Sequence, residues 1–180
     1  VVTQLPWWWN GGTYTRGAYE SLFYYDAKKK SLTRLTAAGL SVSDVQLTED
    51  RKTVYYSLLD VSVPRPVYFG GADLYRMELA SRREEAVAKS RPDFNIATYA
   101  LGRSFLLLLA ADGKYGMNTD VDFYTLDYET LAVSPYAVYG ESIGSSVGSD
   151  IRHGGGRTMK MDGDVLYFIM QRVIYSPLGE

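Results

Sequence analysis

The chain of 180 residues contains no cysteine and only one histidine. The absence of cysteine excludes a disulfide scaffold and catalysis by a thiol, and it favours the cytosol as the compartment. A single histidine without any cysteine also argues against a zinc site, because such sites draw most of their ligands from these two residue types. We therefore expect a protein without metal or cofactor that works in the cytoplasm.

Strong charge of one sign and long hydrophobic runs are missing as well. The formal net charge is -2, which gives no electrostatic reason to expect nucleic acid or an anionic membrane as a partner. The longest apolar run, Phe105 to Ala111, is far shorter than the ~20 residues of a membrane-spanning helix, and it predicts a strand buried on both faces. Residues Val1 to Leu5 have no basic or long apolar segment, so they predict no signal peptide.

A strand-rich pattern returns about every fifty residues. The segment Ser21–Asp26 is similar to Asp73–Glu78 and to Asp122–Asp127, and tyrosines, sixteen in all, are frequent in these segments. A period of roughly 40–50 residues with four strands in each unit is typical of β-propeller blades. Because propellers close with about 4–8 blades, the sequence predicts an all-β fold that is part of a ring, with about three blades' worth of four-stranded antiparallel sheets.

The repeats divide the chain into one partial propeller region, residues 1–180. Residues 1–36 form the end of one blade, 42–88 a full blade, 94–139 a second full blade and 157–170 the start of the next. The predicted strands are Val1–Leu5, Leu22–Asp26, Leu32–Thr36, Val42–Leu47, Thr53–Leu58, Asp73–Leu79, Glu84–Ala88, Phe94–Tyr99, Ser104–Ala110, Asp122–Tyr128, Val133–Tyr139, Arg157–Met161 and Asp164–Met170.

The turns between these strands separate the two faces of the ring. Asp162-Gly163 and Leu101-Gly102 indicate short hairpins, where a residue with positive φ is easily placed. The charge runs Lys28–Lys30 and Ser81–Arg83 indicate solvated hairpin tips that discourage edge pairing. The other connections are long, and long loops on a rigid scaffold usually carry the binding residues. We therefore expect the long-loop face to be the functional one.

Three segments resemble a known family. Leu5–Gly11 with the strands that follow, together with the connector Gly140–Asp150, is similar to the propellers of acylaminoacyl-peptidase-like enzymes of the prolyl oligopeptidase family of serine peptidases. Leu47–Tyr56 resembles the Ser-Pro-Asp-Gly-Lys turn and strand of that family and of TolB. It departs from the pattern because Thr48 and Glu49 replace Ser-Pro, and Arg51 replaces Gly.

The resemblance implies a parent enzyme in which a propeller covers an α/β-hydrolase domain and restricts access to short peptides. None of that family's Ser-Asp-His positions falls in this chain, so the segment itself is expected to be structural and substrate-gating. Its expected partners are the hydrolase domain of the same parent chain and short peptides. A stand-alone TolB-like propeller that binds proteins is the alternative hypothesis.

Two overlapping Gly-x-Ser-x-Gly matches surround Ser142 and Ser146. A nucleophile elbow needs a strand before the serine and a packed helix after it. The residues that follow contain Gly154–Gly156 and no apolar period, which argues strongly against a helix. The only histidine, His153, is better explained by hydrogen bonds within a loop. The chain therefore predicts no catalytic residue.

Other short motifs also favour structural roles. Asp120-Val121-Asp122 and Asp162-Gly163-Asp164 supply too few carboxylates for Ca²⁺ and are better explained as a strand start and a hairpin. Gly154–Gly156 lacks the lysine and helix of a phosphate loop. The candidate residues that face substrate or partner come from the long loops, and they are Trp8, Trp9, Arg16, Arg65, Tyr68, Phe69, Tyr115, Arg152 and His153. Finally, the incomplete blades at both ends predict that the chain alone associates with itself.

Overall fold

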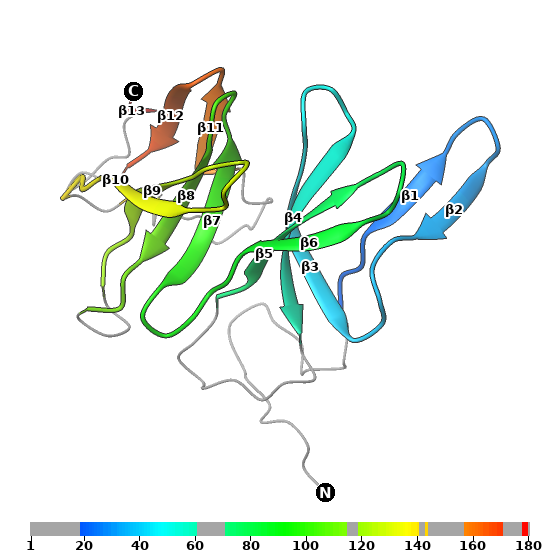
Figure 1. Ribbon diagram of the computed structural model, residues 1–180, viewed down its shortest axis with the longest axis horizontal. Coiled ribbons are helices and arrows are strands. Elements are labelled where there is room, and N and C mark those ends of the chain that lie inside the picture. Colours follow the sequence, from blue (N-terminus) through cyan, green and yellow to red (C-terminus); the bar gives the residue numbers. More distant parts are fainter. Residues whose placement is uncertain are drawn as a thin grey trace, which may run out of the picture.

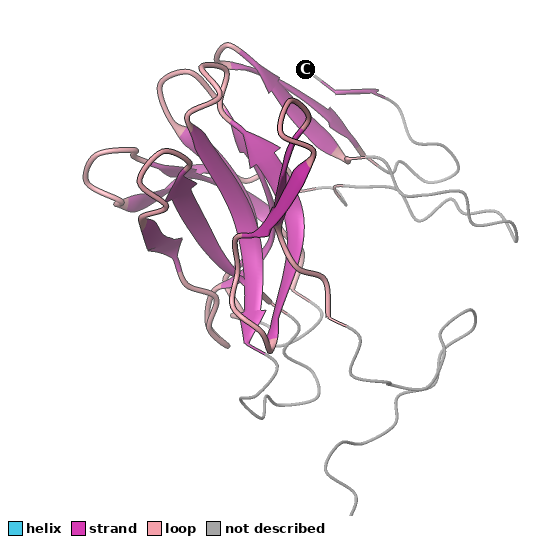
Figure 2. Ribbon diagram, turned by 90° about the vertical axis from the view of Figure 1, so that its right-hand side faces the viewer, coloured by secondary structure: helices cyan, strands magenta, loops and turns pink. Residues whose placement is uncertain are grey.

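The computed structural model describes residues 19–60, 71–114, 119–140, 143, 157–170 and 178–179. Every regular element in these ranges is a β-strand, so none of them contains a helix that could cross a membrane. Figure 2 shows the strands gathered in stacked sheets. The described part of the chain is therefore all-β, as the sequence predicts.

Each sheet is an antiparallel meander in which every strand pairs with the next one along the chain. Blade 1 consists of β1 (Phe23–Asp26) and β2 (Ser31–Arg34). Blade 2 consists of β3 (Leu40–Leu47), β4 (Thr53–Asp60), β5 (Asp73–Glu78) and β6 (Glu84–Ala88). Blade 3 consists of β7 (Asn95–Leu101), β8 (Leu106–Ala111), β9 (Asp122–Leu126) and β10 (Val133–Ala137). Blade 4 consists of β11 (Met159–Asp162), β12 (Val165–Ile169) and β13 (Leu178–Gly179).

The four sheets fan out side by side, with β1–β2 at one end of the fan and β11–β13 at the other (Figure 1). Strand β7 contacts both β3 and β11, so the first strands of blades 2, 3 and 4 lie next to one another. This arrangement is a partial β-propeller with about three blades' worth of strands. Strands β3, β7 and β11 are the innermost strands, which face the ring axis.

The strands from β1 to β12 agree with the predicted ones to within two residues at each end. The predicted strand Val1–Leu5 lies outside the described residues, and β13 was not predicted. Gly163 has the expected positive φ of 62°, but Gly102 does not have a positive φ. Glycine is needed at position 102 because an added Cβ would lie 2.6 Å from the carbonyl oxygen of Phe105. The charged hairpin tips at Lys28–Lys30 and Ser81–Arg83 are exposed, as expected.

Three apolar clusters lie between neighbouring blades. Between blades 1 and 2, the buried residues are Val42, Val54, Tyr56, Leu58 and Met77. Between blades 2 and 3, they are Tyr55, Leu74, Val87, Ile96, Tyr99, Leu106, Leu108, Ala110 and Leu126. Between blades 3 and 4, they are Ala100, Leu107, Leu109, Phe123, Met159, Met161, Phe168 and Met170. The core is therefore divided into layers, one for each contact between blades.

Strand β8 contributes buried side chains to two of these layers. Leu106 and Leu108 belong to the layer with blade 2, whereas Leu107 and Leu109 belong to the layer with blade 4. Because side chains alternate across a strand, an uninterrupted run of leucines places apolar groups on both faces. The prediction that this run forms a strand buried on both faces is confirmed.

Replacing Leu126 with alanine should lower the free energy of unfolding by about 2–5 kcal/mol, because Leu126 is fully buried between blades 2 and 3. The midpoint of urea unfolding, followed by tyrosine fluorescence, measures this loss. Leu47→Ala is the matched control, since Leu47 is 48% exposed and should change stability by less than about 1 kcal/mol. If the two variants lost the same free energy of unfolding, burial of Leu126 between blades 2 and 3 would be contradicted.

Candidate functional site

A group of hydrogen bonds joins the inner strands of blades 2, 3 and 4. Asp44 stands at a bulge in β3 with a φ of 47°, a left-handed conformation that aspartate tolerates better than most residues. Its carboxylate accepts a hydrogen bond of 2.7 Å from the hydroxyl of Thr98 in β7. Arg157, which precedes β11, places Nη2 at 3.3 Å from Asp44 Oδ1 and donates to the carbonyl oxygen of Val45 at 2.5 Å.

Two further hydrogen bonds connect β3 with β7. The hydroxyl of Tyr99 donates to the carbonyl oxygen of Asp44. The side-chain Nε2 of Gln46 donates to the carbonyl oxygen of Tyr99 at 2.7 Å. Burial raises the pKa of the Tyr99 hydroxyl, and the nearby Asp44 charge adds to that rise. Tyr99 therefore stays protonated and keeps donating. We call the set Asp44, Gln46, Thr98, Tyr99 and Arg157 the axial bridge.

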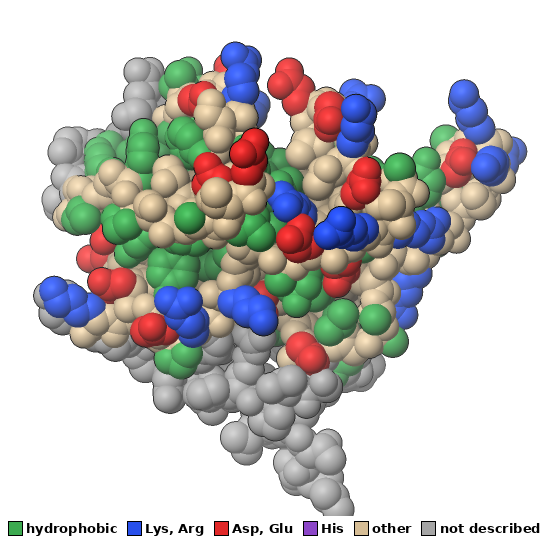
Figure 3. Space-filling model, viewed as in Figure 1, with side chains coloured by type: hydrophobic (Ala, Val, Ile, Leu, Met, Phe, Trp, Pro, Cys, Tyr) green, Lys and Arg blue, Asp and Glu red, His purple; other side chains and the backbone are tan. Residues whose placement is uncertain are grey.

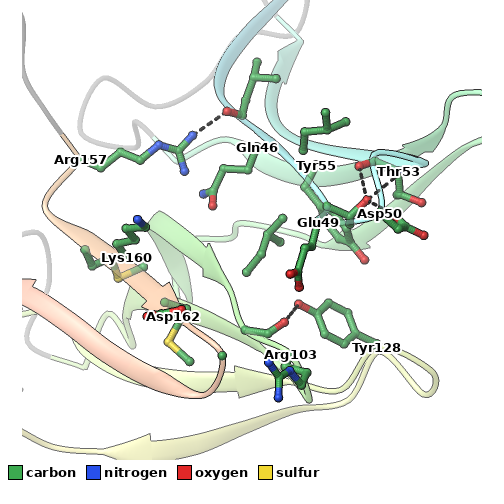
Figure 4. Close-up of a pocket in the computed structure, with 18 residues that line it drawn as sticks. Gln46, Glu49, Asp50, Thr53, Tyr55, Arg103, Tyr128, Arg157, Lys160 and Asp162 are labelled. Carbon is green, nitrogen blue, oxygen red and sulfur yellow. Dashed lines mark hydrogen bonds between the residues drawn. The ribbon is translucent and has the colours of Figure 1, made fainter.

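A cavity of about 1030 Å³ opens beside the axial bridge (Figure 4). Its walls come from the inner strands and from the short turns after β3, β7 and β11, with Tyr55 and Tyr128 between them. The hydroxyl of Tyr128 donates to the carbonyl oxygen of Gly102 at 2.8 Å, which fixes this ring against the β7–β8 turn. The cavity thus lies on the short-turn face, at the ring axis. We call it the axial cavity.

Charged groups of both signs line the axial cavity. Glu49 and Asp50 lie on the β3–β4 turn, and Arg103, Lys160 and Asp162 lie on the side formed by blades 3 and 4 (Figure 4). The hydroxyl of Thr48 and the backbone N–H of Lys52 both donate to Asp50, and these bonds lower its pKa. No ion pair joins Glu49 or Lys160 to another residue in the part of the chain that the structure describes.

A second set of hydrogen bonds fixes the rim of the cavity between blades 3 and 4. The backbone N–H of Ser104 donates to Asp164 Oδ1 at 2.9 Å, and its hydroxyl donates to Oδ2 at 2.7 Å. These two bonds hold the pKa of the Asp164 carboxyl below its ordinary value of 3.8. The N–H of Arg103 also donates to the carbonyl oxygen of Gly163 at 2.9 Å. Asp164 thus connects two hairpins, in agreement with the hairpin interpretation of Asp162-Gly163-Asp164.

The nine candidate residues of the long loops all lie outside the described residues: Trp8, Trp9, Arg16, Arg65, Tyr68, Phe69, Tyr115, Arg152 and His153. Ser142 and Ser146 also lie outside them. These assignments remain predictions. Within the described ranges, no group of three or more histidine, aspartate or glutamate side chains is placed to hold a metal ion.

Sequence analysis missed the axial cavity because it favoured the long loops. A signal was present, since Glu49 and Arg103 each lie two residues after the end of an inner strand, and Asp162 is the last residue of β11. No single one of these turns indicates a binding site. Only the arrangement of the blades around an axis brings the three turns to one rim.

No model of a known protein family matches the sequence, and no curated protein matches it either. Solved structures do share its fold. TolB from Acinetobacter baumannii matches with a TM-score of 0.53 at 10% identity, over 88% of this chain and 34% of TolB. A puromycin-hydrolyzing peptidase from Mycobacterium tuberculosis matches with a TM-score of 0.50 at 17% identity, over 78% of this chain and 19% of the peptidase.

These likenesses support the partial propeller fold. The chain spans about a third of the length of TolB and about a fifth of the length of the peptidase. At such identities the likeness concerns the fold alone. The activities of the two proteins therefore bear on this chain only as a proposal.

The ion pair between Asp44 and Arg157 should contribute a coupling energy of about 0.5–1 kcal/mol, because the side chain of Asp44 is only 20% exposed while that of Arg157 is 43% exposed. A double-mutant cycle with Asp44→Asn and Arg157→Met, followed by urea unfolding, measures it. The coupling should shrink at high salt. The more exposed pair Arg91–Asp93 serves as the control and should show a smaller coupling. Equal couplings at the two pairs would contradict this expectation.

Replacing Ser104 with alanine should raise the pKa of Asp164 part of the way back to its ordinary value, because the hydroxyl bond is lost while the N–H bond remains. A carboxyl with a lowered pKa stabilises the fold above its ordinary pKa, and that contribution is lost as the pH falls through the lowered value. NMR titration of the side-chain carboxyl measures the shift. Asp127, held by Thr130 instead, is the control and should keep its lowered pKa. If the pKa of Asp164 did not change, the hydroxyl of Ser104 would not be a cause of its lowered value.

Proposed function

We propose that the chain is a non-catalytic propeller segment of a serine peptidase of the prolyl oligopeptidase family. The observation that carries the proposal is the axial cavity, an open space of about 1030 Å³ that is lined by three successive blades and by charged groups of both signs. The three sequence segments that resemble this family support it, and so does the fold shared with the puromycin-hydrolyzing peptidase. The parent would hydrolyse peptides with a triad located outside these 180 residues.

The role proposed for the segment is to admit short peptides and to exclude folded proteins. A short peptide carries an amine and a carboxylate at its two ends. Glu49 on one wall of the axial cavity suits the amine, and Lys160 on another wall suits the carboxylate. The axial bridge would keep these walls at a fixed separation, because it ties the three inner strands together. The α/β-hydrolase domain of the same parent chain would be the partner, in the cytoplasm.

A stand-alone propeller that binds a protein partner is the second candidate. The observation that favours it is the match to TolB, which covers more of this chain and has a higher TM-score than the match to the peptidase. In this case, the short-turn rim around the axial cavity would contact the partner. No hydrolase domain would then be required.

The coding sequence downstream of Glu180 separates the two candidates. Further blades followed by a Gly-x-Ser-x-Gly elbow, and then by aspartate and histidine in that order, support the peptidase proposal. A stop codon directly after the last blade of a ring supports the protein-binding propeller and rejects the peptidase.

The purified 180-residue chain should hydrolyse neither peptides nor p-nitrophenyl esters, because no catalytic triad can be assembled from its residues. Release of nitrophenol and of fluorescent amines measures this directly. Turnover that disappears in Ser142→Ala or in Ser146→Ala would contradict the proposed non-catalytic role. Turnover that persists in both variants would indicate a contaminating hydrolase, and a fresh purification would then have to remove it.

A further inference from the structure

A groove of about 400 Å³ lies between the outer strands of blades 2 and 3. Its floor is apolar and consists of Val87, Phe94, Tyr124 and Leu131. All of its lining residues belong to the two four-stranded sheets and to the turns and connection that join their strands, so these two complete blades form the groove by themselves. It shares no lining residue with the axial cavity. We call it the outer groove.

Local contacts hold the floor of the outer groove in place. In the connection between β6 and β7, the backbone N–H groups of Arg91 and Phe94 donate to each other's carbonyl oxygens at 2.8 and 2.9 Å. The Phe94 ring packs edge-on against Tyr124, with 5.0 Å between the ring centroids. On the β9–β10 turn, the N–H of Leu131 donates to the carbonyl oxygen of Asp127 at 3.0 Å. Because the floor is already formed, a ligand pays little to order it.

The charged side chains that line the outer groove are both cations, Lys89 and Arg91. Lys89 is exposed and forms no ion pair within the described ranges. The guanidinium of Arg91 lies over the Phe94 ring, 5.7 Å from its centroid, and its Nε lies 2.9 Å from Asp93 Oδ1. Figure 3 shows apolar side chains below the β9–β10 hairpin, with Lys and Arg side chains (blue) below them.

Acidic groups act on the blade 3 side of the outer groove. Burial raises the pKa of the Tyr124 hydroxyl, and the charges of Asp112 and Asp122 add to that rise. A carboxylate in the groove is therefore favoured beside Lys89 and disfavoured beside Tyr124. The charges thus select both the sign of a ligand group and its position.

The two strands that border the outer groove are the outer edges of their sheets. In the described part of the chain, β6 pairs only with β5 and β10 only with β9. Val133 on β10 is 39% exposed, and Pro135 beside it is exposed and offers no backbone N–H. The edge of β6 therefore has the more complete set of backbone donors and acceptors. An open strand edge beside an apolar floor suits an extended peptide, which adds backbone hydrogen bonds to side-chain burial.

We propose that the outer groove binds an extended segment of a partner protein that combines apolar side chains with an aspartate or a glutamate. The apolar side chains fill the floor between Phe94 and Leu131, and the carboxylate pairs with Lys89. The backbone of the segment runs along the free edge of β6.

This inference goes beyond the proposed function, because it concerns a different surface and requires neither a hydrolase domain nor free peptide ends. Loss of the outer groove as a binding site would leave the peptidase proposal standing. The downstream coding sequence tests the peptidase proposal without any reference to this groove.

Random seven-residue peptides displayed on phage and selected on the purified 180-residue chain test the proposal. Enriched peptides should combine apolar residues with at least one aspartate or glutamate. They are then synthesised with acetylated and amidated ends, and fluorescence anisotropy measures their binding. The blocked ends remove the amine and the carboxylate proposed to bind in the axial cavity. If no peptide is enriched, or if the enriched peptides lack acidic residues, the proposal is overturned.

Two variants place a negative charge in the outer groove. Lys89→Glu and Val133→Glu should each weaken binding of the selected peptides by at least about fivefold, because the new carboxylate repels the acidic residue of the peptide. Lys29→Glu and Val165→Glu are the matched controls, since Lys29 is exposed on the β1–β2 turn and Val165 is 52% exposed on β12. Both controls should bind as the wild type does.

A reversed charge pair provides the second test. Peptides in which lysine replaces the acidic residue should bind the Lys89→Glu chain more tightly than they bind the wild type, and this gain also shows that the variant is folded. Binding in Lys89→Glu or Val133→Glu that equals the wild type would overturn the proposal. Loss of binding in Lys160→Glu would also overturn it, because the peptides would then occupy the axial cavity.

Discussion

The two complete sheets, blades 2 and 3, each bury apolar side chains on both faces, and the fold depends on covering both. In β8, the leucines alternate between the layer with blade 2 and the layer with blade 4, so neither face can meet water without a large loss of hydrophobic stabilisation. A blade therefore cannot be stable alone, and each one is stabilised by its neighbours. This requirement explains why the core consists of separate layers, and why the ends of the fan are its least protected parts.

The axial bridge supplies hydrogen bonds at the inner edges of the blades. Strands β3, β7 and β11 are the inner edges of their sheets, and in the described part of the chain no further strand pairs with these edges. The bulge at Asp44 turns part of the β3 edge away from regular pairing, and the carbonyl oxygens of Asp44 and Val45 accept hydrogen bonds from Tyr99 and Arg157 instead. The same contacts fix the distance between blades, which gives the axial cavity a defined shape.

The axial cavity lies on the short-turn face, whereas the sequence predicts binding residues on the long-loop face. The long-loop face remains a source of candidate residues, such as Arg65 and His153, which lie outside the described part. The short-turn face has Glu49, Arg103 and Lys160 around a common opening. A peptide that passes along the axis would meet both faces, whereas a protein partner would need only one. The two proposed functions thus differ in how they use the same ring.

Local patterns in the sequence were enough to predict strands β1 to β12, their order and the blade repeat, because the alternation of apolar residues and the turn residues are local information. The sequence also determined that β8 is buried on both faces, since only a strand in a central position tolerates such a run of leucines. The site was decided by tertiary structure. Asp44, Thr98 and Arg157 are far apart in sequence and carry no motif, and they meet only because three sheets are placed around one axis. Packing between blades sets these long-range contacts, and no local pattern encodes them.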